Sequence, residues 1–406
     1  MSIDSPPSRA PGTSTAHVIA DDAEALAVAE ELAGEFAAEA AERDARRRLP
    51  RQELDRLSAS GLLGITVPRE HGGADVRART VAEVFRLLAA ADPNIAQIPQ
   101  SHIVYVNVLR QQGDPAQQEF FFGEVLAGRR FGNAQSEAGT KHVQDCRTRL
   151  VRAGDHFVLR GVKQYSTGAL FADWIPVLAR HEDETLHVAY VPGDAPGLTV
   201  VDDWAGMGQR TTASGTVRLE DVAVPPEHVV PHHLTFTGPQ LHGALAQLLH
   251  TAIDVGIAGG ALTEAVKFVR TKARPWFESG QETAAEDPLV IQRVGELSIK
   301  VRSAEALLVA AGEAVDAARA DLTAESAGAA SIAVATAKAY ADPVAVELGS
   351  AVFELGGTRS SLEGLNLNRH WRNARTHTLH DPARWKVQHI GRYVLNGQLP
   401  PRHGLL

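Results

Sequence analysis

The feature that most constrains the fold is a hydrophobic period that changes twice along the chain. From Asp21 to about Gly128, apolar residues recur at the spacing of amphipathic helices. Around Arg130 the pattern changes to short segments rich in Val, Leu and Thr, separated by Gly, Asp and Pro at intervals of roughly ten residues. From about Gly238 onward the pattern is helical again, and the helices are long and rich in alanine. This order predicts a mostly α-helical protein with a central β domain.

The same pattern predicts individual elements and domain limits. In the N-terminal region we expect helices that include residues 50–61, 80–90 and 103–109. Strands are expected at 148–151, 156–160, 174–179, 186–191, 198–200 and 215–219, which suit a small β-sandwich or barrel. Long helices are expected at 240–274, 288–320 and 324–355, the last kinked or split at Pro343. The predicted division is a disordered leader at 1–18, a helical domain at 19–128, a β domain at 129–235 and a four-helix bundle at 236–406.

Composition narrows the class of partner. The 406 residues carry a formal net charge of -9, which argues against binding to nucleic acid or to an anionic membrane, because both need a basic face. The single cysteine, Cys146, excludes an intrachain disulfide and fits a reducing cytosol. No run of about 18 apolar residues is present, so no membrane span is expected. We therefore expect a cytoplasmic protein that binds a small molecule.

Residues 369–382, with the sequence RHWRNARTHTLHDP, concentrate histidine and arginine between two helical patterns. Asp381 and Pro382 read as an N-cap followed by proline at the first position of a helix whose apolar face begins at Trp385. Residues 376–380 would then form a short connection that presents His377 and His380. Neutral imidazole can donate or accept a proton near pH 7, so this stretch is a candidate catalytic segment. A solvated basic turn is the alternative.

Further local motifs occur in a fixed order. They are GLLGITVPREHGG at 61–73, GNAQSE at 132–137, GVKQYSTG at 161–168, RTKARPW at 270–276 and the glycine pair Gly356 and Gly357. In this order they resemble the acyl-CoA dehydrogenase superfamily over essentially the whole chain. The resemblance implies a helical N-terminal domain, a middle β domain and a C-terminal four-helix bundle, assembled as a homotetramer or homodimer.

The dehydrogenases of that superfamily abstract an α-proton with a glutamate, and this chain has none where they carry it. One family location falls on 379–382, where Asp381 is a methylene short and is expected to cap a helix. The other is the helix after the β domain, where residues 229–263 contain no glutamate and a single acid, Asp254. The histidine-rich replacement is similar to the flavin monooxygenase branch typified by dibenzothiophene monooxygenase, and most similar to the sulfur-acquisition oxidoreductases.

The resemblance to that branch implies a reaction and roles for particular residues. Its members take reduced FMN (FMNH₂) from a separate NAD(P)H-dependent reductase and add O₂ to form a C4a-hydroperoxyflavin, here for a small organosulfur substrate. His380 would protonate the distal oxygen, with His377 and His102 in support, and Ser166 would bond near N5. Helix capping is the alternative for His102. An N-hydroxylating enzyme, an FAD-dependent acyl-CoA dehydrogenase and a flavin-free binding protein are the alternative functions.

The cofactor site is also assigned by resemblance. Asn133 and Ser136 would serve the pyrimidine edge, Trp204 would cover the ring or the substrate cavity, and Arg274, Gly356, Gly357 and Arg359 would approach the phosphate end. For Trp204 a place in the β-domain core is the alternative. No GxGxxG follows a strand, so a nicotinamide site is not expected, which supports a partner reductase. The HxxH pair lacks an acid or cysteine at ligand spacing, so no metal site is expected.

Overall fold

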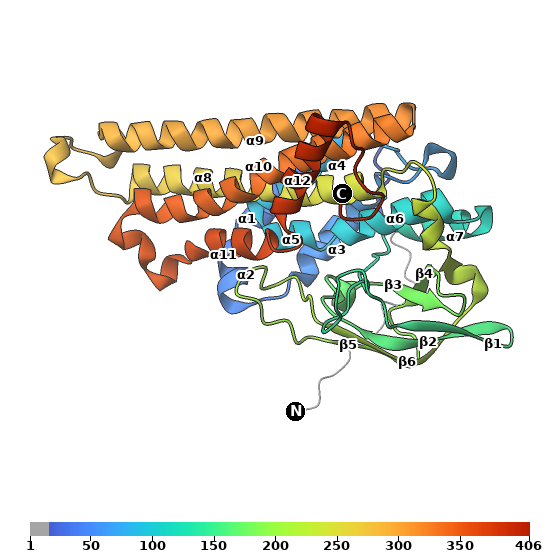
Figure 1. Cartoon of the computed structure of the whole chain (residues 1–406). Coiled ribbons are helices and arrows are strands. Elements are labelled where there is room, and N and C mark those ends of the chain that lie inside the picture. Colours follow the sequence, from blue (N-terminus) through green and yellow to red (C-terminus); the bar gives the residue numbers. More distant parts are fainter. Residues whose placement is uncertain (1–15) are drawn as a thin grey trace.

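The computed structural model of the protein describes residues 16–406. Most of the predicted leader, residues 1–15, lies outside this range. Residues 16–18 of the predicted leader lie inside it, and there the backbone N–H of His17 donates to the Ala59 carbonyl oxygen at 3.0 Å. Figure 1 shows the long helices of the C-terminal half along one side of the molecule and the sheet on the other, with the N-terminal helices between them. The predicted limits at residues 128 and 235 stay a prediction.

The N-terminal helices pack against the bundle and the sheet. They are α1 (Asp22–Ala37), α2 (Ala40–Arg46), α3 (Arg51–Ala59), α4 (Ala78–Ala91), α5 (Pro93–Gln97), α6 (Gln100–Gln112) and α7 (Pro115–Leu126). The predicted helices at 50–61, 80–90 and 103–109 are confirmed. Helix α7 begins with a capping box, in which Asp114 and Gln117 bond each other's backbone N–H groups, followed by proline at the first helical position.

Between residues 149 and 230, seven strands form one hydrogen-bonded sheet in the order β5-β6-β2-β1-β3-β4-β7. The strands are β1 (Arg149–Ala153), β2 (His156–Lys163), β3 (Trp174–His181), β4 (Leu186–Pro192), β5 (Leu198–Val201), β6 (Thr216–Val224) and β7 (Val229–Val230). Six of them were predicted. β4 and β6 are not neighbours in the sheet, yet they contact one another and share one buried cluster. The sheet therefore curls around its own core, as expected for a small sandwich or barrel.

Three long helices form the body of the bundle: α8 (His242–Thr271), α9 (Pro288–Ala320) and α10 (Ala324–Gly356). The short helices α11 (Asn368–His377) and α12 (Ala383–Asn396) follow. The predicted bounds are confirmed to within a few residues, but α10 is continuous through Pro343 and is not split there. Helix α8 is long and apolar enough to cross a membrane, yet 72% of its apolar window is buried inside the protein, as in a core helix.

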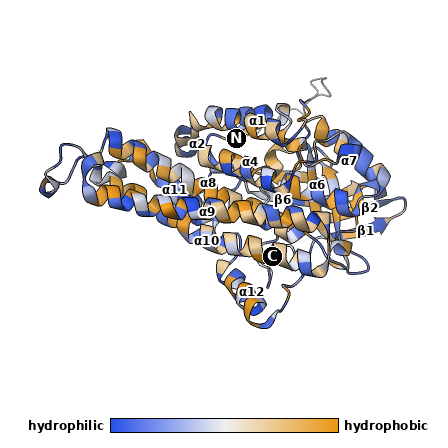
Figure 2. Ribbon diagram, turned by 90° about the horizontal axis from the view of Figure 1, so that it is seen from above, coloured by the Kyte–Doolittle hydropathy of each residue, from blue (hydrophilic) through white to orange (hydrophobic). Residues whose placement is uncertain are grey.

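Helix α12 corrects the predicted N-cap. Its N-cap is Pro382, and no side chain caps it, so Asp381 is not the predicted N-cap. Its apolar residues do not face the core: Trp385 is 51% exposed, Val387 58% and Leu395 83%. Within the described chain, Lys386 is the one buried residue of α12. Figure 2 shows this helix set apart from the other helices of the bundle.

The short helix α11 contacts α10 through a close approach of the two backbones. A Cβ atom on Gly349 would lie 2.6 Å from Cα and 2.8 Å from the backbone nitrogen of Trp371. Such distances are shorter than van der Waals contact, and backbone atoms cannot rotate away. Gly349 therefore fixes how deeply α11, with His377 at its end, lies against the bundle.

This contact predicts the effect of Gly349→Ala. The added methyl group should push α11 away from α10 and lower the free energy of unfolding by about 1–3 kcal/mol, the usual cost of overpacking. The matched control is Gly34→Ala in α1, where nothing lies within 4 Å of the new Cβ. That change should instead stabilise the protein by about 0.5–1 kcal/mol. Equal effects of the two changes in denaturant titrations would contradict the close contact.

Candidate active site

Three imidazoles from two distant segments converge at the end of α11. His377 is the last residue of α11, His380 lies in the turn that follows, and His250 comes from α8. Their ring centroids lie 4.6–5.3 Å apart. Nδ1 of His250 is 3.3 Å from Nε2 of His377. The structure thus brings together the two histidines predicted from the HxxH pair and adds a third. Residue 377 is helical, so the predicted connection at 376–380 is shorter than expected.

A buried ammonium group lies close to these rings, on the far side of Asp254 from His377. Lys338 of α10 is fully buried, and its Nζ lies 3.4 Å from Oδ2 of Asp254, 3.1 Å from Oδ1 of Asp342 and 3.7 Å from Oδ1 of Asp381. Asp381, the residue expected to cap α12, instead pairs with Lys386 at 2.6 Å. Oδ1 of Asp254 is 2.6 Å from Nδ1 of His377, so one carboxylate joins the ammonium to the imidazole.

The charges of this network can be assigned. Burial, and then the charge of Asp254, raises the pKa of Asp342 to about 8, so Asp342 is neutral near pH 7. Burial opposes the charge of Lys338, but the surrounding carboxylates, Asp254 foremost, outweigh it and raise the pKa of its ammonium. Lys338 therefore stays cationic. Asp254 supplies the balancing negative charge, because Asp342 holds the proton that the two acids share.

Hydrogen bonds fix the tautomers of His377 and His380. Burial lowers the pKa of both rings, that of His377 well below its usual range, so both are neutral near pH 7. Nδ1 of His377 donates to the Asp254 carboxylate at 2.6 Å, and Nδ1 of His380 donates to the His377 carbonyl oxygen, also at 2.6 Å. Each ring then has an unprotonated Nε2. That of His380 faces the NH₂ group of Gln97 at 3.3 Å, and that of His377 faces the Gln97 Oε1 at 3.0 Å, which is itself an acceptor. The site is therefore rich in hydrogen-bond acceptors.

His102, a predicted participant, has a different setting. Its Nε2 bonds the Leu63 carbonyl oxygen at 3.0 Å, and its Nδ1 accepts from the backbone N–H of Phe131 at 2.9 Å. Burial lowers its pKa to about 4, so the ring is neutral. Both nitrogens are thus used by backbone groups. This geometry suits a residue that joins α6 to the start of the β domain, and it does not match the catalytic role expected for His102.

The predicted flavin-facing residues lie on neighbouring segments of the β domain. The backbone N–H of Gln164 donates to the Ser136 carbonyl oxygen at 3.0 Å. The segment that carries Ser136 therefore lies beside the segment that carries Ser166. Asn133 accepts from the hydroxyl of Tyr105 at 3.3 Å. The hydroxyl of Ser166 is buried, and it has no hydrogen-bond partner among the residues the structure describes. Such an orphaned donor fits a polar atom of a bound ligand.

Trp204, predicted to cover the flavin or the substrate cavity, is half-buried and borders an open cavity of about 470 Å³. It is therefore not a β-domain core residue. Its indole N–H donates to the Gln209 carbonyl oxygen at 2.7 Å, and its ring lies edge-on to Tyr165, 5.9 Å away.

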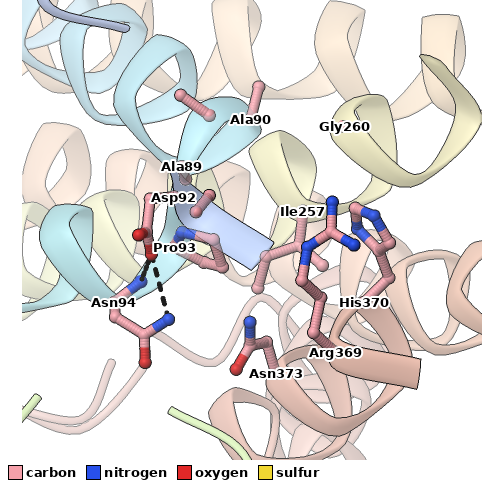
Figure 3. Close-up of a pocket in the computed structure, with 12 residues that line it drawn as sticks. Ala89, Ala90, Asp92, Pro93, Asn94, Ile257, Gly260, Arg369, His370 and Asn373 are labelled. Atoms are coloured by element: carbon pink, nitrogen blue, oxygen red, sulfur yellow. Dashed lines mark hydrogen bonds between the residues drawn. The ribbon is translucent and has the colours of Figure 1, made fainter. Parts of the chain in front are cut away.

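Two asparagines hold the loop of Trp204 in place. Asn373 accepts from the backbone N–H of Gln209 at 2.7 Å, and Asn94 accepts from that of Thr211 at 3.2 Å. Figure 3 shows Asn94 and Asn373 on either side of a small cavity between α5 and α11. At about 10 Å³ this cavity has room for one water molecule at most, so it serves packing.

The residues predicted for the phosphate end lie elsewhere. Arg274 is exposed beyond the end of α8, and Arg359 follows Gly356 and Gly357, with its guanidinium 3.5 Å from the Lys272 carbonyl oxygen. A helix rises about 1.5 Å per residue, so the end of α8 at Thr271 lies about 30 Å from His250. Within one chain these four residues are therefore not brought to the histidines.

Several residues of the site were missed from the sequence. His250, Asp254 and Lys338 stand 127, 123 and 39 residues from His377 (377 − 250, 377 − 254 and 377 − 338), and no local motif links them. The one available signal was a polar residue on an otherwise apolar helical pattern, as at Asp254 and Lys338, because a buried charge requires a partner. Asp254 was noted, but only as an unsuitable base.

The chain is similar to known proteins over most of its length. The family models for the acyl-CoA dehydrogenase N-terminal, middle and C-terminal domains match residues 21–129, 131–222 and 248–385. Dibenzothiophene monooxygenase of Rhodococcus erythropolis is 35% identical, over 94% of this chain and 95% of its own length. The probable FMNH2-dependent monooxygenase SfnC of Pseudomonas putida is 34% identical, over 93% of this chain and 96% of its own.

A solved structure, that of FMN-bound TdsC from Paenibacillus sp. A11-2, is 31% identical and superposes with a TM-score of 0.89, covering 94% of this chain and all of that one (100%). The chain belongs to the acyl-CoA dehydrogenase family. Within that family it is a flavin-dependent monooxygenase, as the segment with His377 and His380 predicted.

The setting of His102 predicts a pH effect on stability. Its pKa is about 4 in the folded protein and about 6.5 in an unfolded chain, so below pH 6.5 the unfolded state binds the extra proton and stability falls. His102→Gln keeps a donor and an acceptor but cannot titrate. Between pH 6.5 and 4 its free energy of unfolding should fall less steeply than that of the wild type, by up to about 1.4 kcal/mol per pH unit. Equal slopes in urea titrations at several pH values would contradict this assignment.

Proposed function

We propose that the protein is the oxygenase of a two-component, FMNH₂-dependent system that oxygenates a small organosulfur compound during sulfur acquisition. A separate NAD(P)H-dependent reductase supplies the reduced FMN, and the setting is cytoplasmic. The observation that carries the proposal is the acceptor-rich pair His377 and His380, held neutral where a dehydrogenase needs a free carboxylate. The names of the relatives support sulfur chemistry and FMN.

The acids of the site argue against α-proton abstraction. Asp254 uses one oxygen for His377, at 2.6 Å, and the other for Lys338, at 3.4 Å. Asp381 is paired with Lys386, at 2.6 Å, and lies 3.7 Å from Lys338. A carboxylate held by a cation is a weak base, because removing a proton with it would break the ion pair. The dehydrogenase alternative therefore lacks a base in this site.

The residues present fit a reduced flavin. The unpartnered hydroxyl of Ser166 can bond a ring nitrogen, and Asn133 and Ser136 can serve the pyrimidine edge next to it. Reduced FMN, when bound, supplies the electrons with which O₂ is activated. The loop of Trp204, fastened by Asn94 and Asn373, would limit the entry of water to this region.

The histidines would bond the reacting oxygen and transfer its proton. Asp254 holds the single proton of His377 on Nδ1, and the His377 carbonyl oxygen holds that of His380 on Nδ1. The two Nε2 atoms can then accept a hydrogen bond from the oxygen to be transferred and return a proton to the oxygen that leaves as water. His380, which borders solvent, is the better placed to exchange that proton.

We further propose that the cofactor site is completed by a second copy of the chain, in a homotetramer or a homodimer. Arg274, Gly356, Gly357 and Arg359 lie at the far end of the bundle, about 30 Å from the histidines along α8, which is too far for one FMN. A neighbouring chain can place the same residues beside Ser136 and Ser166.

The proposed function predicts that His380→Ala uncouples the reaction. Without the imidazole, reduced FMN should still consume O₂, but product formation should fall by about 100-fold, in the range of lost acid–base catalysis, while hydrogen peroxide accumulates. The measurement follows O₂ uptake, peroxide and sulfoxide with dibenzothiophene as the probe substrate and an added flavin reductase. His389→Ala, on α12, is the matched control and should stay coupled. Coupling as in the wild type after His380→Ala would remove His380 from the mechanism.

A further inference from the structure

We propose that His250, His377 and His380 form a binding site for a first-row divalent cation such as Zn²⁺, and that the bound cation inhibits the enzyme. The cation would bind without the flavin, and the inhibition rests on the proposed use of the histidine nitrogens in oxygenation. No metal site was expected from the sequence, because the HxxH pair lacks an acid or cysteine at ligand spacing. Helix α8 supplies that ligand, 127 residues before His377 (377 − 250).

The spacing of the nitrogens suits a tetrahedral centre. Zn²⁺ binds histidine at about 2.0–2.1 Å, which places two ligand nitrogens of a tetrahedron about 3.3–3.4 Å apart. Nδ1 of His250 and Nε2 of His377 are 3.3 Å apart. One nitrogen from each of the three rings lies within 4.8 Å of the others, so a small rotation closes the set. His380 borders solvent, which gives the cation a route of entry and a water for the fourth position.

The rings are already oriented as metal ligands. In zinc sites the second ring nitrogen usually donates to a carboxylate or a backbone carbonyl oxygen, which fixes the tautomer. Here Nδ1 of His377 donates to Asp254 and Nδ1 of His380 donates to the His377 carbonyl oxygen, both at 2.6 Å. Each Nε2 is thereby left with a lone pair directed at the same small volume. A cation needs to displace no proton from either ring.

Hydrogen-bond donors are few in the same volume. Besides the amide of Gln97, Nδ1 of His250 can donate to Nε2 of His377 at 3.3 Å, and a cation would take the place of that proton once the His250 ring adopts its other tautomer. The two Nε2 lone pairs face the single amide of Gln97, whose NH₂ group can serve one of them, while its oxygen is left facing the other. A cation at the centre of the rings would satisfy every acceptor at once. Lys338 does not prevent this, because Asp254 lies between its ammonium and His377 and balances its charge. An all-nitrogen ligand set favours Zn²⁺, Co²⁺, Ni²⁺ or Cu²⁺ over Mg²⁺ and Ca²⁺.

Cobalt binding tests the site without any assay of activity. Co²⁺ accepts the same ligands as Zn²⁺ and is coloured, so the chelator-treated full-length protein is titrated with Co²⁺ in the absence of flavin. We expect an intense visible absorption that saturates at one Co²⁺ per chain, is abolished by Zn²⁺ and is unchanged by excess Mg²⁺. The absence of stoichiometric binding at concentrations up to about 100 μM would overturn the proposal.

Variants connect the signal to the three rings. His250→Gln should raise the dissociation constant for Co²⁺ at least about 100-fold, and His389→Gln on α12 should leave it unchanged. Circular dichroism shows whether each variant is folded, and His380→Gln provides a second ligand deletion if His250→Gln is not. A Co²⁺ signal that survives the loss of either ligand in a folded variant would contradict the proposed site.

The functional consequence is tested separately. One equivalent of Zn²⁺ should suppress oxygenation of dibenzothiophene by the wild-type enzyme and leave FMN binding unchanged, and a chelator should restore activity. Metal binding with full oxygenation would leave the metal site standing and contradict the catalytic use of the histidines. Oxygenation that depends on His380 without any metal binding would overturn the metal site and leave the proposed function standing.

Discussion

The buried ammonium of Lys338 is the interaction on which the arrangement of the site depends. It joins α10 to Asp254 of α8 and to Asp381 in the turn before α12, and it lies in the interior with no access to water. A buried charge is tolerated only with partners, and removing one partner of such a pair costs about 3–5 kcal/mol. Any backbone movement that separates α8, α10 and the turn before α12 would break these ion pairs and destabilise the protein by a similar amount. The ion network therefore holds together the segments that carry the histidines.

This network also explains how the family fold can support a different chemistry. A free carboxylate would make a base, whereas Asp254 is held between an ammonium and an imidazole and instead fixes the proton of His377 on Nδ1. The site thereby has neutral rings with unprotonated Nε2 atoms in place of a charged base. Neutral rings suit oxygen chemistry, because they can bond a proton on oxygen and do not repel a developing negative charge.

Much of the fold could be predicted because it follows from local patterns. The bounds of α9 and α10 and six of the seven strands between residues 149 and 230 were predicted from hydrophobic period and from breaks at Gly and Pro. Helix α12 shows the limit, since the apolar spacing of Trp385 and Leu395 is helical but says nothing about which surface covers it. Asp381 before Pro382 had the sequence of a cap, but its ion pairs with Lys386, in the first turn of α12, and with the distant Lys338 overrode that local preference.

Only the part of the site that is local in sequence could be predicted. His377 and His380 are close in sequence, so their motif was visible, and the structure places them together. His250 and Lys338 become neighbours only when α8 and α10 pack, and no spacing rule connects them. The bonds of His102 to Leu63 and Phe131 depend likewise on how α6 meets the β domain. Tertiary contacts, which a single sequence does not contain, determine the positions of His250, Lys338 and His102.

The chemistry of the site depends on a neutral His377 whose proton Asp254 holds on Nδ1 and whose Nε2 is unprotonated. The most direct test is nitrogen NMR of the protein labelled with ¹⁵N-histidine, with the His377 signals assigned by their loss in His377→Gln. We expect one protonated nitrogen, bonded to the carboxylate, and one unprotonated nitrogen, both unchanged between about pH 6 and 8, because burial keeps the pKa of the ring well below its usual value. An imidazolium, or a proton on Nε2 in place of Nδ1, would contradict it.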